Sequence, residues 1–256
     1  MTNQEILKIA MTQSAVDLCA DASDFEKSEN VIVPSHVSEG ARRYLKLPFS
    51  CQLVYYGNNV VASVSPEFRE IAENYVNKYP VEHLFETPNL HVFNEALQKE
   101  GQKICFMAEY FLPDVNALRP LDCEYALRIL TQKDFAALYL PEWSNALCKQ
   151  RKELDVLGVG AFDGETLVGL AACSADCDTM WQIGIDVLPA YRRQGLASAL
   201  TSRLAIEILS RGKVPFYCAA WSNVKSVRNA IKSGFRPAWV EMTAKSIETV
   251  EEMNQV

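Results

Sequence analysis

The chain has 256 residues, 49% hydrophobic and 22% charged, with 11 Gly and 11 Pro. This composition is that of a globular protein and excludes disordered, collagen-like and coiled-coil chains. The formal charge of −7 argues against nucleic-acid binding, because contacts to phosphates need clustered Lys and Arg. No apolar run approaches the roughly 18 residues of a membrane span, and the N-terminus lacks signal-peptide features, so we expect a cytoplasmic protein with no membrane partner.

Eight cysteines are scattered through the chain without a C-x-x-C pair, and there are only three histidines. We therefore interpret the thiols as reduced and buried, and we expect no metal site. The charges are unevenly spread: residues 1–120 carry 10 basic and 16 acidic side chains, whereas residues 121–240 carry 14 and 12. The second part of the chain is thus the more favourable place for a small polyanion.

The first part of the chain begins with a helical spacing of apolar residues over positions 3–20. Two β-rich runs joined by Gly57-Asn58-Asn59 predict a hairpin. Pro66 begins a helix at a position where a missing N–H has no cost. The predicted elements are strands 52–56 and 60–64, helix 66–79, strand 81–85, helix 89–100 and strand 103–111.

A stretch from Leu112 to Pro120 is interpreted as a linker, which predicts an N-terminal domain over 1–120 and a second domain over 121–256. The second domain is predicted to contain strand 124–130, helical segments within 131–152, strands 156–162 and 166–174 in a hairpin, strand 180–187, helix 195–211, strand 214–221, helix 223–233 and strand 235–245. Both domains are of the α/β (α+β) class.

The most informative segment joins strand 180–187 to helix 195–211. The strand ends before Pro189, a basic turn with Arg192 and Arg193 follows, and the helix begins with the small residues Gly195 and Ala197. The N–H groups of a first helical turn are free, and the helix dipole places roughly half a positive charge there. Small residues leave that backbone uncovered, so the segment is suited to binding a pyrophosphate.

Three spaced motifs resemble the GNAT superfamily of acetyl-CoA-dependent N-acetyltransferases. They are Arg192-x-x-Gly195-x-Ala197 after Val187-x-Pro189, then Asn223-x-x-Ser226, then Gly234-Phe235. The resemblance covers about residues 122–245, and the predicted order of elements is the one that the family uses. It implies a mixed, mostly antiparallel sheet flanked by helices. It also implies an enzyme that moves an acetyl group directly from acetyl-CoA to a primary amine of a small molecule or peptide.

The resemblance further implies that coenzyme A lies where strand 180–187 and strand 214–221 separate. Its pyrophosphate would be held by main-chain N–H groups of residues 192–197, and its pantetheine arm would lie along Ile185 to Val187. The Val187 N–H would act as an oxyanion donor. The implied cofactor-binding residues are Ile185, Val187, Arg192, Arg193, Gln194, Gly195, Leu196, Ala197, Ser198 and Asn223.

Two positions depart from the family pattern and leave the catalytic residues open. Ala230 stands where many relatives have the Tyr that protonates the leaving thiolate, and Trp181 stands where many have a Glu base. Tyr217, Asp186 or a chain of waters are the remaining candidates for proton transfer. A second hypothesis is therefore a non-catalytic acyl-CoA-binding sensor. The acceptor and the oligomeric state cannot be read from the sequence.

A short string recurs 123 residues apart, as Val64-x-Pro66-x-Phe68-Arg69 and as Val187-x-Pro189-x-Tyr191-Arg192. The helices and strands predicted after each copy also run in parallel. We hypothesise that residues 1–120 are a degenerate GNAT-like copy without the anion-binding turn, since Glu70 replaces Arg193 and Ala72 replaces Gly195. Such an acidic companion domain would favour a cationic amine as acceptor.

Overall fold

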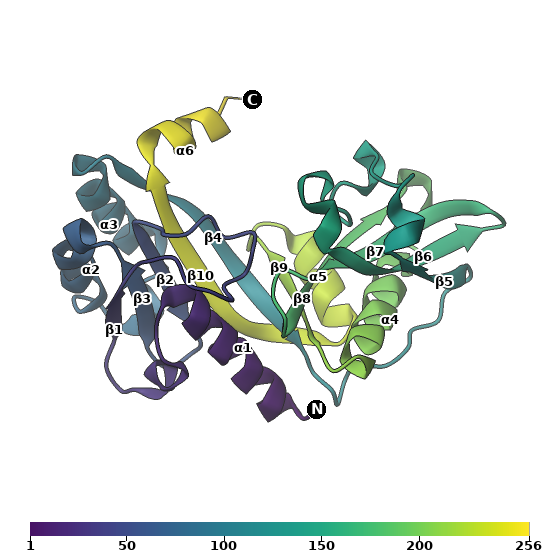
Figure 1. The fold of residues 1–256 in the computed structure, drawn as a ribbon, viewed down its shortest axis with the longest axis horizontal. Coiled ribbons are helices and arrows are strands. Elements are labelled where there is room, and N and C mark those ends of the chain that lie inside the picture. The colour runs from purple at the N-terminus through teal and green to yellow at the C-terminus, as the bar shows by residue number, and fades with distance from the viewer. Residues whose placement is uncertain (256) are drawn as a thin grey trace. The chain divides into compact units, whose positions relative to one another are not determined.

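The computed structural model describes residues 1–255, which fold into two compact units (Figure 1). The 110–237 unit also contains residues 1–10, and the 11–109 unit also contains the segment from Ala238 onward. Two long strands, β4 (Gln102–Pro113) and β10 (Phe235–Ser246), therefore contribute residues to both units, as does helix α1 (Asn3–Leu18). The domain boundary predicted at residue 120 stays a prediction. The chain passes from one unit to the other within α1, β4 and β10, after residues 10, 109 and 237.

A mostly antiparallel sheet forms the centre of the 110–237 unit, as predicted. Strands β5 to β8 are antiparallel neighbours, and β8 pairs in parallel with β9. Its strands in spatial order are the end of β4, β9 (Val214–Ala219), β8 (Met180–Val187), β7 (Thr166–Ser174), β6 (Asp155–Asp163) and β5 (Ala126–Thr131).

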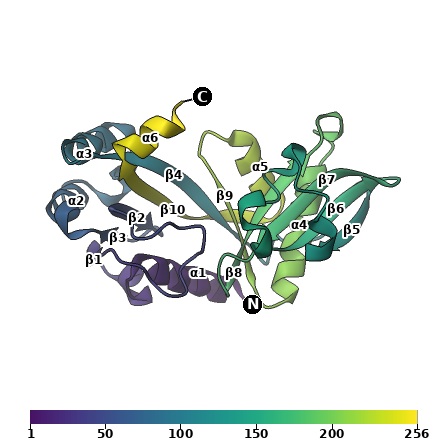
Figure 2. The same ribbon diagram turned by 45° about the horizontal axis from the view of Figure 1, so that its top comes forward.

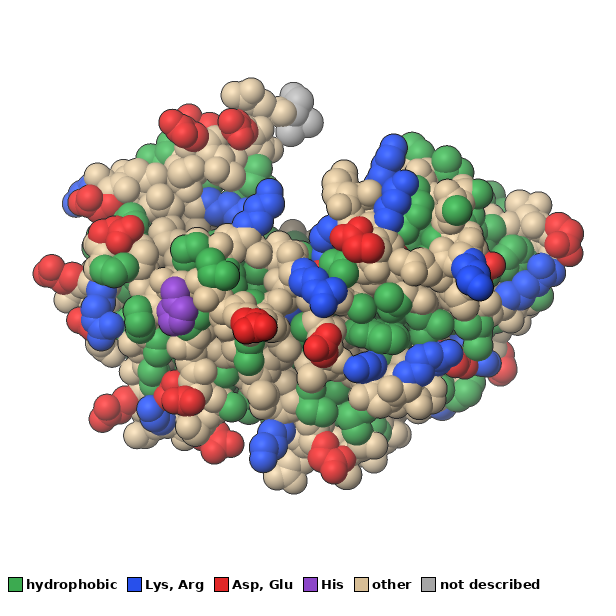
Figure 3. Space-filling model, in the orientation of Figure 1, with side chains coloured by type: hydrophobic (Ala, Val, Ile, Leu, Met, Phe, Trp, Pro, Cys, Tyr) green, Lys and Arg blue, Asp and Glu red, His purple; other side chains and the backbone are tan. Residues whose placement is uncertain are grey.

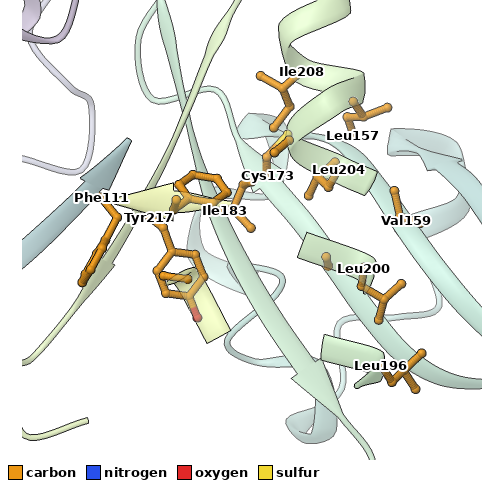
Figure 4. Packing of buried hydrophobic residues seen from close by; sticks show 14 of the residues in the cluster. Phe111, Leu157, Val159, Cys173, Ile183, Leu196, Leu200, Leu204, Ile208 and Tyr217 are labelled. Atoms are coloured by element: carbon orange, nitrogen blue, oxygen red, sulfur yellow. The ribbon is translucent and has the colours of Figure 1, made fainter. Parts of the chain in front are cut away.

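The two faces of this sheet are covered by different segments (Figures 1 and 2). Helix α4 (Leu196–Ser210) packs on one face, where Leu200 and Leu204 lie in one buried cluster with Cys173 and Ile183, as Figure 4 shows. The other face is covered by three short 3-10 helices at Gln132–Phe135, Pro141–Trp143 and Lys149–Leu154, where helical segments were predicted. From Leu170 to Cys173 successive residues of β7 alternate between the two clusters, as a strand buried on both faces requires.

The 11–109 unit has its own sheet and core. Its strands in spatial order are β1 (Val31–Pro34), β3 (Val60–Val64), β2 (Cys51–Tyr55), β10 and β4. Strands β2 and β3 form the predicted hairpin, and β1 pairs in parallel with β3. Helices α2 (Arg69–Val76) and α3 (Thr87–Lys99) pack on this sheet through Tyr75 and Phe93, whose rings stack at 4.2 Å. A short helix, α6 (Ile247–Met253), was not predicted.

The strand predicted at 81–85 is wrong, because Val81–His83 forms a 3-10 turn. Pro80 and Val81 accept the backbone hydrogen bonds of His83 and Leu84, so these groups are satisfied locally and need no neighbouring strand. The hypothesis of an internal repeat thereby loses one of its four parallel elements. The recurring string itself does form the same local structure twice, a strand followed by a 3-10 turn, at Pro66–Phe68 and at Pro189–Tyr191.

Charged side chains of both signs are interspersed over the face drawn in Figure 3. No helix among residues 1–255 is long and apolar enough to cross a bilayer.

A buried ionic network lies in the 11–109 unit and was not predicted. The Arg42 guanidinium bonds the Asp17 carboxylate and donates to Glu241 Oε1 at 2.6 Å, and all three residues are at most 2% exposed. Trp239 Nε1 donates to the same Glu241 oxygen at 2.8 Å. Burial raises the pKa of Asp17, and the Arg42 charge opposes that rise. Arg42 thus anchors the segment between β1 and β2 to the core.

Replacing Arg42 by Met should lower the free energy of unfolding by about 3–5 kcal/mol, because two buried carboxylates then lack a cation. Arg43→Met is the matched control: Arg43 is the exposed neighbour, so its replacement should change stability by less than about 0.5 kcal/mol. Chemical denaturation of both variants measures the difference. Equal stabilities would show that the network contributes nothing.

A second buried carboxyl gives the 110–237 unit a predictable response to pH. Asp155, 1% exposed at the start of β6, accepts a hydrogen bond from the Cys148 N–H at 2.9 Å. Burial raises its pKa to about 6 from an ordinary 3.8, while that hydrogen bond and Arg151 act in the opposite direction. Between these two values the folded state binds more protons than the unfolded state, so this group makes stability fall as pH rises.

In Asp155→Asn the fall in unfolding free energy between about pH 4 and pH 7 should shrink by up to about 3 kcal/mol, because roughly two units of pKa difference are removed. Denaturation at several pH values, compared with the parent protein, measures it. Parallel curves for the two proteins would contradict the assignment.

Candidate functional site

The parallel pairing of β8 and β9 ends early and leaves an open strand edge. Only Met180 to Gln182 pair with Val214 to Phe216. Beyond these residues β8 keeps its antiparallel partner β7, up to the pair of Gly169 and Val187, but pairs with no residue of β9. Among the residues that the structure describes, the edge of β8 that faces β9 therefore has no strand partner from residue 183 to its end.

The direction of the backbone groups on this edge follows from the β7–β8 ladder. Leu188 N donates to Val168 O at 3.0 Å, so these opposite residues form a hydrogen-bonded pair. Because such pairs alternate along an antiparallel ladder, Val187 and Ile185 turn their N–H and C=O groups away from β7 and toward the open edge. The side chain of Arg192 donates from Nε to the Val187 carbonyl at 2.9 Å. Of the two Val187 backbone groups on this edge, the N–H is therefore the one available to a ligand.

The predicted anion-binding turn follows directly after this edge. Pro189–Tyr191 forms a 3-10 turn, and Gly195 is the N-cap of α4 with φ +82°. Arg193 also has a positive φ of 65°, which is uncommon for a residue with a side chain. The first bond of the helix runs from Ala199 N to Gly195 O, so the N–H groups of residues 196–198 have no acceptor within the helix. Leu196 is buried and anchors this helix start in the core.

The polar side chains of the turn have mixed roles. Arg192, Arg193 and Gln194 are exposed, and the Tyr125 hydroxyl donates to Gln194 Oε1 at 2.7 Å. Two other predicted cofactor residues use their side chains within the protein. Ser198 Oγ donates to Asn229 at 3.2 Å, and Asn223 caps helix α5 (Val224–Lys232) by accepting from Ser226 N at 3.2 Å. The structure thus assembles the backbone groups predicted for the turn, while Ser198 and Asn223 face protein partners.

Asp186 binds the segment around residues 145–146, which covers the face of the sheet that does not carry α4. Its carboxylate accepts hydrogen bonds from Asn145 N at 2.8 Å, Asn145 Nδ2 at 2.7 Å and Ala146 N at 2.9 Å. On the same face of β8, a Cβ on Gly184 would come within 1.9 Å of the Asn145 carbonyl oxygen. Asp186 and Gly184 therefore seat this segment on the strand, and the Asp186 carboxylate is directed toward residues 145 and 146.

Tyr217 is the first residue of β9 beyond the last bridge to β8. It is 3% exposed in the main core, and Figure 4 shows its ring beside Phe111 and Ile183. Its hydroxyl lies 2.7 Å from Ser226 Oγ in the first turn of α5, and burial raises its pKa. Ala230, one turn further along α5, is fully buried in the same cluster. The phenol of Tyr217 thus reaches the helix face that carries Ala230.

One cation near the turn was missed in the sequence. Lys232, at the end of α5, places Nζ 3.7 Å from the point where a Cβ of residue 195 would lie. No motif connects two residues 37 positions apart, so only the packing of α5 on α4 could show this proximity.

Several solved structures are similar to this chain. A GCN5-related N-acetyltransferase-like protein from Streptococcus suis 89/1591 matches with 20% identity and a TM-score of 0.45, over 61% of this chain and 69% of that one. A GCN5-related N-acetyltransferase from Kribbella flavida matches with 15% identity and a TM-score of 0.47, over 62% and 64%. A Salmonella typhimurium protein solved with its cofactor acetyl-CoA matches with 16% identity and a TM-score of 0.37, over 49% and 95%.

No curated protein matches the chain. The family model described as GNAT acetyltransferase matches residues 81–238, which is more than half of the 256 residues and contains the open edge of β8 and the turn before α4. The chain therefore belongs to the GNAT acetyltransferase family, whose acetyl donor is acetyl-CoA.

Proposed function

We propose that this protein is an N-acetyltransferase that moves the acetyl group of acetyl-CoA to a primary amine. The observation that carries the proposal is the unpaired edge of β8, which leads through one short basic turn to the N-terminus of α4, where the first N–H groups have no helical acceptor. A peptide-like arm can complete the edge as an added strand would, and a diphosphate can accept from the free N–H groups of α4.

The residues present fit the pantetheine arm and the diphosphate of coenzyme A. Ile185 offers its backbone N–H and C=O to the pantetheine amides, while the Val187 C=O already accepts from Arg192 and its N–H is left for the thioester. Residues 193–197 offer backbone N–H groups to the diphosphate, and Arg192 and Arg193 offer cationic side chains. Leu196 contributes its backbone, because its side chain is buried. Asn223 and Ser198 support the site chiefly by holding α5 in place.

When bound, acetyl-CoA supplies a thioester carbonyl that an amine can attack directly, with no acyl-enzyme. The Val187 N–H is the donor for the oxygen on which negative charge develops, and removing such a donor in other enzymes costs about 3 kcal/mol. The Tyr217 phenol is protonated at neutral pH, as tyrosine ordinarily is, and burial raises its pKa further, so it is the candidate that donates a proton to the leaving thiolate. The proton of the amine leaves through water, since the Asp186 carboxylate is directed toward residues 145 and 146.

A non-catalytic acyl-CoA sensor is the second candidate. It is favoured by Ala230 and Trp181 at the positions of the usual acid and base and by the engagement of Asp186. A screen of primary amines that follows free thiol separates the two functions: thiol release supports the enzyme, and binding of acetyl-CoA without release across the panel supports the sensor.

Gly195→Glu should abolish acetyl-CoA binding, because it places a carboxylate over the N–H groups that hold the diphosphate. Thermal shift measures the effect: saturation at 100 Kd stabilises a protein by about 2.7 kcal/mol, and the variant should show no such shift. Gly212→Glu is the matched control. Gly212 lies just after the other end of α4 with a similar φ of +73°, so it imposes the same backbone strain away from the turn. Unchanged binding by Gly195→Glu would overturn the proposed function.

Tyr217→Phe should lower kcat for thiol release by about 10²-fold or more, with the affinity for acetyl-CoA unchanged, because it removes a proton donor and keeps the packing of the ring. Single-turnover kinetics with the best amine of the screen, together with calorimetric binding of acetyl-CoA, test this. A variant as fast as the parent protein would exclude Tyr217 as the acid.

A further inference from the structure

Helix α5 is fixed against the first turns of α4 by one polar side chain. Asn229 accepts from Ser198 Oγ at 3.2 Å and donates from Nδ2 to Thr201 Oγ1 at 3.0 Å. The buried Ser233 hydroxyl in turn donates to the Asn229 carbonyl at 2.7 Å and closes the end of α5. The last turn of α5 is therefore held in a defined place beside the N-terminus of α4.

This docking carries the Lys232 ammonium to the anion-binding turn. Nζ lies 3.7 Å from the position that a Cβ on Gly195 would take. Because residue 195 is a glycine, no side chain stands between Nζ and the backbone of the turn. Lys232 is exposed, so the charge stays available to a ligand from solvent. The free backbone of the turn and the Lys232 cation therefore lie next to each other.

The cations beside this turn differ from those further along α4 in their ion pairs. Arg203 and Arg211 are both paired with Glu207, at 2.8 and 2.9 Å. Within residues 1–255, by contrast, neither Lys232 nor Arg193 has an ion pair with a carboxylate. Both cations also lie near the positive end of the α4 dipole, where a further positive charge is unfavourable. An anion bound at the turn removes this repulsion.

We propose that Lys232 is a binding residue for the diphosphate of acetyl-CoA and clamps it from α5 while the N–H groups of α4 hold it from the other side. This inference rests on the proposed function and assigns a residue that the turn motif does not contain. Lys232 is assigned to the diphosphate and not to the 3′-phosphate, because its Nζ lies beside Gly195, directly before the free N–H groups of α4.

The test measures the affinities of CoA and of 3′-dephospho-CoA by calorimetry for the full chain and for Lys232→Gln. A charge-assisted hydrogen bond at an exposed site is worth about tenfold in affinity, so both ligands should bind about 10-fold more weakly to the variant, by the same factor. The loss of affinity with added salt should also be less steep in the variant. Lys232→Arg should restore binding to within about threefold.

Lys133→Gln, which removes an exposed lysine from the 3-10 segment on the other face of the sheet, is the charge-matched control and should leave both affinities unchanged. A loss confined to CoA would overturn the proposal, because Lys232 would then contact the 3′-phosphate. Unchanged affinity with a lower melting temperature of the free protein would also overturn it, because Lys232 would then serve only the dipole of α5. If the parent protein binds neither ligand, it is the proposed function that fails.

Discussion

The site depends on a single constraint, which is that β8 and β9 pair over only three residues and then separate. A buried or half-buried strand edge leaves N–H and C=O groups that must find partners, and the free energy of leaving them unpaired is large. In this protein Ile185 and Val187 present such groups, and water or an added strand-like ligand must satisfy them. The length of the open edge is set by the point where the parallel ladder ends. The ligands that the edge can bind are those that supply hydrogen-bond partners to its N–H and C=O groups.

The surrounding residues keep that separation in place. On one face of the sheet Leu196, Leu200 and Leu204 press α4 onto β7 and β8. On the other face, Gly184 and Asp186 seat the 145–146 backbone against β8 so closely that a single methyl group would not fit. Between the helices, Asn229 connects the start of α4 to the end of α5. The unpaired end of β8 is thus held by apolar contacts with α4 on one face and by hydrogen bonds to residues 145–146 on the other. The hydrogen bonds of Asn229 fix the neighbouring helices relative to each other.

The 11–109 unit is held by a different mixture of forces. An apolar cluster around Tyr75 and Phe93 packs its helices on the sheet, while the ionic network of Arg42, Asp17 and Glu241 fixes the segment between β1 and β2. Such a network is costly to bury and specific in geometry, so it selects one conformation of a segment that has no regular structure of its own. Glu241 lies in β10, so the last strand of the chain is needed to complete the unit formed by its first half.

The sequence by itself determined the helices and strands whose signals are local: the hairpin at Gly57-Asn58-Asn59, the strands around Gly164, and the strand, basic turn and helix from Met180 to Ser210. It also carried the family motifs, because the end of the strand, the basic turn and the start of the helix follow one another directly in the chain. It failed at Val81–Phe85, where an apolar run forms a 3-10 turn because its backbone hydrogen bonds are satisfied locally. The helical segments predicted within 131–152 are present as short 3-10 helices.

Only the tertiary structure decided which groups meet across long separations. Lys232 lies beside Gly195, and the Tyr217 hydroxyl contacts Ser226. Asp186 accepts hydrogen bonds from the 145–146 backbone, and Arg42 pairs with Glu241, 199 residues away. Periodicity and turn chemistry act over a few residues, so they place a side chain on a face of its own element. Its partner depends on how elements distant in the chain pack together, which is a property of the whole fold.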